Sequence, residues 1–383
     1  MNGINLDNLK IALVYDRVNK FGGAERVLLS LHEMFPNAPL YTSVYNELSA
    51  SWAHDFPKIY TTFLQKIPFL KNNHELIGWL MPLAFETFDF SNYDLVISVT
   101  SEAAKGIITG TNTLHVCYCL TPTRYLWSAR DFYFNNPPKK FNIFPFFKIF
   151  AKPFVGYLEK WDSIASTRPD KMIAISTEVK SRIKKYYKRN SEIIYPPCDL
   201  PRKVMGSSKG KYYFIHGRFE PYKRLDLVID VFNDLELRLV VSGSGSEFLR
   251  LQRKANQNIK FVYKPSDNQL PDLYKNAMAF LMPQEEDFGI TSVEAQSFGV
   301  PVIAYNKGGA IDTVIPDKTG VLFNSQTKEI LKQAIAKFDT MRFNNIDLIN
   351  NAKIFSKERF KRELQRSLVR SYLSWRWGDK TLA

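Results

Sequence analysis

Cysteine is scarce in this sequence, with three among 383 residues. Cys117, Cys119 and Cys198 are too few for a disulfide framework. A Cys-x-Cys pair without a second cluster of His or Cys is also a poor zinc site. These absences favour a protein of a reducing compartment.

Long hydrophobic runs are missing as well. The most apolar stretch, residues 141–158, is interrupted by two prolines and two lysines, so it does not read as a membrane-spanning helix. Residues 1–10 are polar and lack the apolar core of a secretory signal. We therefore expect a cytoplasmic protein.

The familiar nucleic-acid motifs are absent, although basic residues are in excess. Lysine and arginine number 52 against 38 acidic residues, which gives a formal net charge of +14. Such a surface attracts anions. Without zinc-finger spacing, a basic region leading into heptads or an RNA-recognition sheet motif, we expect no nucleic-acid partner. The anionic partner that remains is a nucleotide or an anionic membrane surface.

Short buried strands alternate with amphipathic helices in both halves of the chain, and this pattern predicts two α/β domains with parallel sheets. The first half begins with a strand, a glycine loop and a helix at 24–34, and the second half has its first helix at 225–235. The expected strands are 10–15, 94–98, 114–118 and 171–175 in the first half, and 212–216, 237–241, 259–263, 279–282 and 300–304 in the second.

The strand pattern stops before a polar stretch at residues 199–211, which predicts a domain boundary there. We expect a first Rossmann-like domain at 1–198, a second at 199–365, and a terminal helix at 366–383 that crosses back to the first domain. In doubly wound sheets ligands bind outside the carboxyl ends of the strands. The site should therefore lie in a cleft between the two sheets.

The richest candidate site is residues 283–303, where an acidic loop joins a buried strand to a helix. Backbone amides at the start of that helix suit phosphate or hydroxyl groups, and Gly289 permits close approach of a ligand. Glu286 and Glu294 are suited to accept hydrogen bonds from a sugar and a ribose. The alternative is that Glu286 and Asp287 only favour the helix dipole. The candidate donor-binding residues here are Phe288, Gly289, Ile290, Thr291 and Glu294.

Two further loops follow the first strand of each half. Arg218 and Lys223 in the second half are expected to meet across their loop and neutralise a diphosphate, unless the loop is only a solvated basic surface. Gly22 and Gly23 occupy the matching loop of the first half. That loop lacks the Gly-x-Gly-x-x-Gly fingerprint, which argues against a nicotinamide or flavin enzyme.

Taken in order, these motifs resemble glycosyltransferase family 4, the retaining transferases of the GT-B fold, in which two Rossmann-like domains face each other across a cleft. The residues that carry the resemblance are Gly22-Gly-Ala-Glu-Arg26, Gly217-Arg218 with Lys223, Glu286-x7-Glu294, Gly299-x-Pro301, Gly308-Gly309 and Thr319-Gly320. The stretch Glu285–Thr291, together with Thr121–Trp127, is further similar to bacterial mannosyltransferase-like members that build O-antigen and other surface polysaccharides.

The resemblance implies catalytic roles for three side chains. Arg218 and Lys223 would stabilise the leaving diphosphate, while Glu286 contacts the donor sugar and Glu294 the nucleotide ribose. The nucleobase of the donor would lie near Tyr263 and Lys264, after the third strand of the second domain. Neither a metal nor another cofactor is implied, which agrees with the absence of an Asp-x-Asp motif.

One position departs from the family pattern. Relatives often carry a histidine before the Thr-Pro of the first-domain motif, and Leu120 stands there in this chain. A leucine side chain cannot form a hydrogen bond, so we expect altered recognition of the donor, a different donor, or a weakened enzyme. His115 is expected to be a strand residue and not a replacement.

An aromatic and basic stretch, residues 132–150, is a second candidate surface. It either flanks the acceptor entrance on an anionic leaflet or forms an aromatic core helix. In the membrane interpretation Lys139, Lys140, Lys148 and Lys152 lie at headgroup level.

The sequence thus predicts a glycosyltransferase that moves a hexose from a nucleoside diphosphate sugar to a lipid-linked or oligosaccharide acceptor in surface polysaccharide synthesis. GDP-mannose is the favoured donor, and the expected location is the inner face of the cytoplasmic membrane. Two alternatives stay open: a GT-B sugar-nucleotide epimerase, and a non-catalytic glycan-binding or scaffold subunit.

Overall fold

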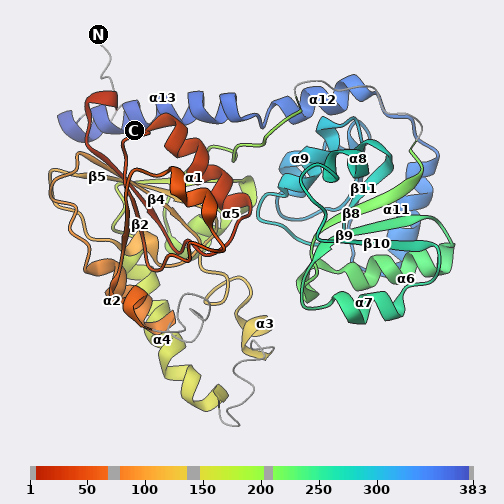
Figure 1. Ribbon diagram of the computed structural model, residues 1–383, viewed down its shortest axis with the longest axis horizontal. Helices are drawn as coiled ribbons and strands as arrows, with labels where there is room; N and C mark the ends of the chain where they lie inside the picture. Colours follow the sequence, from red (N-terminus) through yellow and green to blue (C-terminus); the bar gives the residue numbers. More distant parts are fainter. Residues whose placement is uncertain (1–5, 68–77, 136–146, 202–209, 379–383) are drawn as a thin grey trace. The chain divides into compact units, whose positions relative to one another are not determined.

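The computed structural model describes residues 6–67, 78–135, 147–201 and 210–378, which form two compact units (Figure 1). The first unit comprises Met1–Ile175, Val179–Pro196 and Phe360–Ala383, and the second comprises Ser176–Glu178 and Pro197–Arg359. Apart from Ser176–Glu178, the chain therefore stays in the first unit up to Pro196, and residues from Phe360 onward belong to that unit again.

Within the described residues, the first unit is built on a seven-stranded parallel sheet in the order β3-β2-β1-β4-β5-β6-β7. Its strands are β1 (Ile11–Tyr15), β2 (Leu40–Thr42), β3 (Ile59–Thr61), β4 (Leu95–Thr100), β5 (Leu114–Cys119), β6 (Lys171–Ala174) and β7 (Glu192–Ile193). Its helices are α1 (Gly23–Met34), α2 (Met81–Glu86), α3 (Arg130–Asn135), α4 (Phe147–Ala165), and most of α5 (Thr177–Arg182) and of α13 (Lys357–Trp377).

The second unit repeats the same plan, with a sheet of six parallel strands among the described residues in the order β10-β9-β8-β11-β12-β13. The strands are β8 (Tyr212–Arg218), β9 (Leu239–Ser244), β10 (Ile259–Tyr263), β11 (Ala277–Met282), β12 (Val302–Tyr305) and β13 (Gly320–Phe323). The helices are α6 (Leu225–Leu235), α7 (Phe248–Lys254), α8 (Leu270–Lys275), α9 (Ile290–Ser297), α10 (Ala310–Thr313), α11 (Lys328–Asp339) and α12 (Asn345–Lys353).

Helices cover both faces of the second sheet because alternate residues of its strands point to opposite sides. Ile215 and Leu281 pack in one core with residues of α6, α7 and α11. Phe214 and Phe280 pack in the other core with residues of α8 and α9 (Figure 1). Inner strands such as β11 are largely buried on both faces, which explains why they read as hydrophobic runs.

The sheet order fixes where ligands are expected. In each unit the first strand pairs with a neighbour on either side: β1 lies between β2 and β4, and β8 lies between β9 and β11. Successive crossovers therefore leave in opposite directions at β1/β4 and at β8/β11. Loops after these strands diverge and open a crevice at the carboxyl edge of the sheet.

The strands expected from sequence are all present within a few residues of their predicted bounds. The sequence pattern did not predict β2, β3, β7 and β13. Of the aromatic stretch 132–150, residues 136–146 lie outside the described residues, and these include Lys139 and Lys140. None of the helices in the described ranges combines the length and apolar character needed to cross a membrane.

Candidate functional site

Two loops of the second unit converge at its predicted ligand edge. Lys223 ends a short turn after β8, and Glu286 lies in the loop after β11. The Lys223 ammonium donates to Glu286 Oε1, and both side chains are mostly buried. Gln284 Nε2 donates to the same oxygen at 2.8 Å. The predicted cation and the predicted sugar-binding carboxylate are therefore in direct contact.

Glu286 is also fixed through its main chain. The Gly309 amide donates to the Glu286 carbonyl at 2.8 Å, and Gly308 forms an isolated parallel bridge with Glu286. Gly308 has φ +66°, and a Cβ there would lie 2.1 Å from the Glu286 carbonyl oxygen. The glycine pair is thus needed for the close approach of two loops.

Tyr222 connects the two predicted cations. Arg218 Nη2 donates to the Tyr222 hydroxyl at 2.6 Å. The Arg218 guanidinium and the Lys223 ammonium lie 5.9 and 5.2 Å from the Tyr222 ring centroid. Arg218 and Lys223 therefore share this ring, a role that sequence reasoning missed although Tyr222 lies inside the same motif.

The helix start expected at Ile290 is present as the first residue of α9. Gly289 precedes it in the left-handed region, at φ 90° and ψ 54°. Ile290 and Thr291 form its first turn, so their amides point toward the carboxyl edge of the sheet. Phe288 is 5% exposed and packs edge-on against Phe355 at 5.5 Å between centroids, which makes its side chain part of the core.

Glu294 lies deeper than the loop residues. It is 8% exposed, and its Oε2 accepts from the Tyr274 hydroxyl at 2.9 Å. Tyr274 is itself buried and stacks on Phe298 at 5.5 Å. No sequence pattern had singled out Tyr274, because it lies on a separate helix, α8.

Lys264 directly follows β10 and lies in the third loop at the carboxyl edge of the second sheet. Its backbone is left-handed at φ 48°, and its amide donates to the Gly243 carbonyl at 2.8 Å. A Cβ on Gly243 would lie 1.8 Å from the Gly217 carbonyl oxygen, so the carboxyl ends of β8 and β9 lie close together beside Lys264. The exposed Tyr263 ring packs on Phe248 at 4.6 Å.

Gly22 and Gly23 belong to the first unit, where they begin α1. Glu25 follows in the first turn and is buried, and its Oε1 accepts from the Tyr15 hydroxyl at 2.6 Å. Burial, with a further contribution from Glu25, raises the pKa of Tyr15 well above its usual value, so the phenol keeps its proton.

Asp16, directly after β1, organises the loop that follows β4. Its carboxylate accepts from the amides of Ser101 and Ala104 at 2.8 and 2.9 Å and from the Thr100 hydroxyl at 2.8 Å. Burial raises the pKa of Asp16. These bonds join the two loops at the crevice of the first sheet.

The motif 121–127 is organised by a buried carboxylate that sequence analysis did not identify. Asp162 Oδ1 accepts from Lys105 Nζ at 2.5 Å and Thr123 Oγ1 at 2.9 Å. Its Oδ2 accepts from Trp127 Nε1 at 2.7 Å and the Tyr187 hydroxyl at 2.8 Å. Because α4 carries Asp162 among aromatic residues, no local pattern marked it.

His115 is a buried residue of β5, as expected, and its Nε2 lies 2.8 Å from the Ser98 hydroxyl. Burial lowers its pKa to about 3, with smaller contributions from Arg189 and Arg168, so the ring is neutral at physiological pH. Leu120 directly follows β5, and its amide donates to the Thr100 carbonyl at 2.8 Å.

Among the described residues, no group of three or more His, Cys, Asp and Glu side chains is placed to hold a metal ion.

Comparison with known proteins places these residues in a family context. Residues 200–355 match the family model described as glycosyl transferases group 1. Nearly all of the second unit, including Arg218, Lys223 and Glu286, lies inside the match.

Most of the chain aligns with solved structures. The Anabaena protein HepE in complex with UDP aligns with a TM-score of 0.67 and 18% identity, over 94% of this chain and 99% of that one. The chain has the GT-B fold. Its two parallel-sheet units are the two Rossmann-like domains of that fold, and the match to the glycosyl transferases group 1 model falls on the second of them.

Curated relatives match over shorter regions. An uncharacterized glycosyltransferase of Methanocaldococcus jannaschii is 26% identical over 201 residues, which is 51% of this chain and 56% of the relative. A GDP-mannose-dependent alpha-(1-6)-phosphatidylinositol monomannoside mannosyltransferase of Mycobacterium tuberculosis is 29% identical over 138 residues, 31% of this chain and 36% of the relative. The alignment thus spans about half, or less, of these relatives.

Proposed function

We propose that this protein is a retaining glycosyltransferase that moves a hexose from a nucleoside diphosphate sugar to a lipid-linked or glycan acceptor. The observation that carries the proposal is the Lys223–Glu286 contact at the β8/β11 crevice. This contact joins a cation of the kind that binds phosphate to a carboxylate of the kind that binds sugar hydroxyls. Both residues lie within the region that matches the group 1 family model.

The chemistry asks for positioning and charge. A departing diphosphate develops negative charge, which Arg218 and Lys223 would stabilise. Glu286 pairs with the Lys223 ammonium, and its carboxylate is the kind of group that accepts a hydrogen bond from a sugar hydroxyl. The amides of Gly289, Ile290 and Thr291 add donors at the start of α9. In this mechanism the departing phosphate takes the acceptor's proton, and no metal is required.

We favour GDP-mannose as the donor and surface polysaccharide as the product. The name of the Mycobacterium tuberculosis relative supports mannose. The UDP bound in HepE supports the competing uridine donors. A donor panel therefore needs GDP-mannose, UDP-glucose and UDP-galactose side by side.

The test measures nucleotide release by the purified full chain with each donor, with and without a bacterial membrane extract. We expect acceptor-dependent release of GDP or UDP. Lys223→Ala should lower the turnover number by about 100-fold, as expected for loss of one charge-stabilising group. Lys254→Ala is the matched control, since Lys254 pairs with Asp230 at 2.6 Å on a different face of the same unit.

The two alternatives give different results in the same assay. A sugar-nucleotide epimerase would convert or hydrolyse its donor without any acceptor. A non-catalytic glycan-binding subunit would release no nucleotide across the panel. Full turnover by Lys223→Ala would show that the site lies elsewhere.

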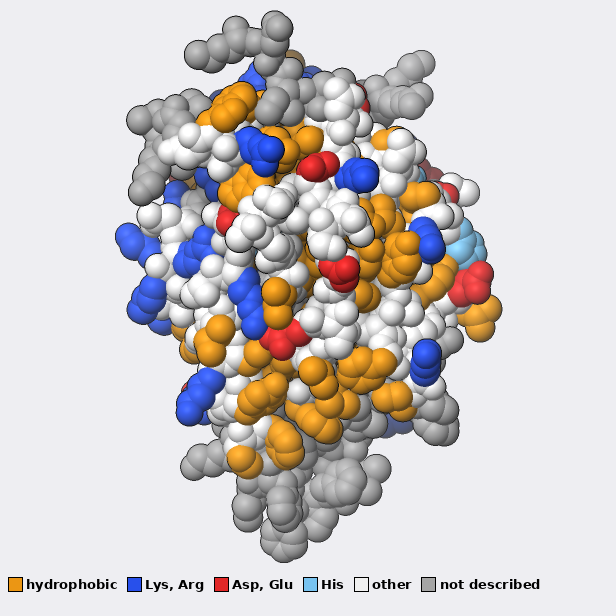
Figure 2. Space-filling model, turned by 90° about the vertical axis from the view of Figure 1, so that its left-hand side faces the viewer, with side chains coloured by type: hydrophobic (Ala, Val, Ile, Leu, Met, Phe, Trp, Pro, Cys, Tyr) orange, Lys and Arg blue, Asp and Glu red, His pale blue; other side chains and the backbone are white. Residues whose placement is uncertain are grey.

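A lipid-linked acceptor requires a surface that meets a membrane. We propose for this role an apolar patch on the first unit formed by Trp79, Leu83, Phe154 and Tyr157, which are 44%, 53%, 49% and 48% exposed. The Trp79 and Phe154 rings lie 5.8 Å apart between centroids. Figure 2 displays hydrophobic side chains gathered toward the lower end of this face, with lysines and arginines at its margins. Amphipathic rings with basic neighbours suit a lipid headgroup region.

Flotation with phosphatidylglycerol vesicles tests this surface. Trp79→Ala combined with Tyr157→Ala should reduce the bound fraction, while Leu249→Ala, at an exposed leucine of the second unit, should not. Equal flotation of all variants, or no binding at low salt, would refute a membrane role for the apolar patch.

A further inference from the structure

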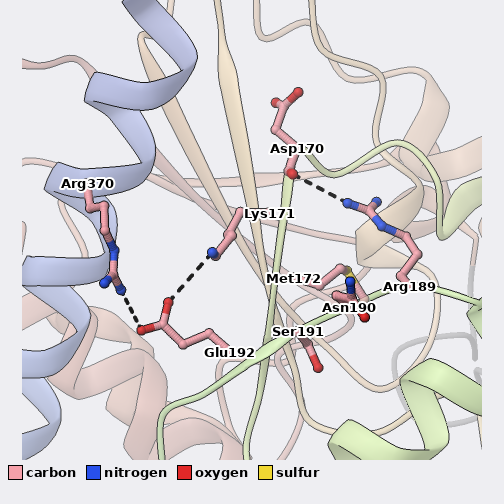
Figure 3. Close-up of a pocket in the computed structure, with 8 residues that line it drawn as sticks. All are labelled: Asp170, Lys171, Met172, Arg189, Asn190, Ser191, Glu192 and Arg370. Atoms are coloured by element: carbon pink, nitrogen blue, oxygen red, sulfur yellow. Dashed lines mark hydrogen bonds and ion pairs between the residues drawn. The ribbon is translucent and has the colours of Figure 1, made fainter. Parts of the chain in front are cut away.

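A cavity in the first unit lies away from the ligand edge of its sheet. Its lining includes the first residues of β6 and β7, so it opens at the amino ends of these strands (Figure 3). Its volume is about 590 Å³, within the range of small-molecule sites. The lining residues are Asp170, Lys171, Met172, Arg189, Asn190, Ser191, Glu192 and Arg370.

One carboxylate in this cavity serves two cations. Glu192 Oε1 accepts from Arg370 Nη2 at 2.7 Å, and its Oε2 lies 3.8 Å from Lys171 Nζ. Figure 3 displays Glu192 between these two side chains. Ser367, from the same helix as Arg370, also donates to Glu192 at 2.8 Å. Glu192 can therefore neutralise only one of the two positive charges.

The third cation, Arg189, binds carbonyl groups. Its guanidinium donates to the carbonyl oxygens of Ser166, Pro169 and Asp170 at 2.9, 2.6 and 3.4 Å. No ion pair joins it to a carboxylate among the described residues. The Asp170 carboxylate instead accepts from the His115 amide at 2.8 Å. Burial lowers the pKa of Arg189, which reflects a charge that the protein only partly compensates.

Ser191 adds an independent observation. Its side chain is 9% exposed, and its hydroxyl makes no hydrogen bond to any described residue. A buried hydroxyl without a partner is costly, and such groups are usually satisfied by a ligand or a water molecule. Ser191 lines the same cavity as the three cations.

We propose that this cavity binds a phosphate group, with Lys171, Arg189 and Arg370 supplying positive charge and Ser191 supplying a hydrogen bond. The group can belong to a soluble phosphorylated compound or to a phospholipid headgroup. The inference does not depend on the proposed glycosyl transfer, because all of these residues lie at the edge of the first sheet opposite the β1/β4 crevice.

The first experiment titrates inorganic phosphate into the full-length protein by calorimetry. Ser191→Ala removes the hydroxyl without breaking any described contact and should weaken binding several-fold. Arg370→Gln should weaken it about tenfold, the size expected for a charged hydrogen bond. Arg366→Gln, at an exposed arginine of α13 outside the cavity, should bind phosphate like the wild type.

The second experiment distinguishes the two sources by flotation with vesicles of phosphatidylglycerol. Flotation that is lost in Ser191→Ala and in Arg370→Gln, but kept in Arg366→Gln, identifies a headgroup. Phosphate binding without such flotation identifies a soluble ligand. Unchanged phosphate affinity and unchanged flotation in both cavity variants, or a wild type that binds neither probe, would overturn the proposal. Loss of phosphate binding in Lys223→Ala would assign the phosphate to the second unit instead.

Discussion

At the scale of single residues, the first unit contains a buried ion pair between Lys105 and Asp162. Both side chains are 1% exposed. Burial by itself would lower the pKa of Lys105, but the Asp162 carboxylate raises it, so the ammonium stays charged inside the protein. Since Asp162 also accepts from Trp127, this charge pair holds the 121–127 motif in place.

We expect Asp162→Asn to lower the free energy of unfolding by about 3–5 kcal/mol, because Lys105 would remain as a buried charge without its counter-ion. The double variant Lys105→Met with Asp162→Asn should be less destabilised than Asp162→Asn alone. Urea denaturation followed by circular dichroism measures both. A double variant as unstable as the sum of the two single variants would show that the charges do not interact.

His115 predicts a specific dependence of stability on pH. Its folded-state pKa of about 3 lies below the ordinary value of 6.5, so between these values the unfolded chain binds more protons than the folded one. Stability from His115 is fully present above pH 6.5 and is lost as the pH falls toward 3. At pH 5 the loss is about 2 kcal/mol.

The measurement compares urea denaturation at pH 7.5 and pH 5 for wild type, His115→Gln and His54→Gln, the last at an exposed position. His115→Gln should reduce the difference between the two pH values, and His54→Gln should not. A difference that is the same in all three proteins would contradict the assignment to His115.

At the scale of secondary-structure elements, Gly308 and Gly309 connect the loop after β12 to the loop after β11. We expect Gly308→Ala to move the Glu286 main chain, since its Cβ would lie 2.1 Å from the Glu286 carbonyl oxygen and its φ is +66°. A left-handed alanine alone costs about 1–2 kcal/mol. Nucleotide release should fall at least about tenfold in a protein that still folds.

Gly110→Ala is the matched control, because a Cβ at Gly110 has no heavy atom within 4 Å. It should leave nucleotide release unchanged. Wild-type release by Gly308→Ala would mean that the position of Glu286 does not limit the reaction.

The limits of sequence reasoning are also visible at this scale. Apolar runs such as 279–282 predicted their strands, because both faces of an inner parallel strand are buried. Strands β2 and β3 have three residues and β7 has two, too few for any periodicity to appear. These short strands are defined by hydrogen bonds to neighbouring strands of the sheet, and the local sequence does not encode that pairing.

The candidate site likewise contains residues that the sequence could predict and residues that it could not. Residues close in sequence to a glycine turn, such as Lys223 and Glu286, could be predicted from the motifs, and the structure brings these two into contact. Tyr274 and Asp162 could not, because each reaches its partner from a different helix. Such partners depend on tertiary packing and leave no local signature.

At the scale of the whole molecule, the two units have separate cores, and the last helix completes the first of them. Phe360 is fully buried, and its ring meets that of Tyr118 on β5 edge-on at 5.7 Å. Leu364 and Leu368 continue the buried stripe at helical spacing. Residues 360–377 therefore pack on the first sheet, whose first strand begins at residue 11, and contribute to its folding.

We expect Phe360→Ala to destabilise the first unit by about 3–5 kcal/mol, the usual cost of removing a buried phenylalanine. Thermal unfolding in the presence of UDP or GDP separates the units, since a ligand of the second unit raises only the transition of the unit that binds it. The transition that does not respond to nucleotide should move to lower temperature in Phe360→Ala and stay unchanged in the exposed-site control Arg366→Ala. If instead both transitions fall together, the two units unfold as one cooperative body, and α13 stabilises the whole chain rather than the first sheet alone.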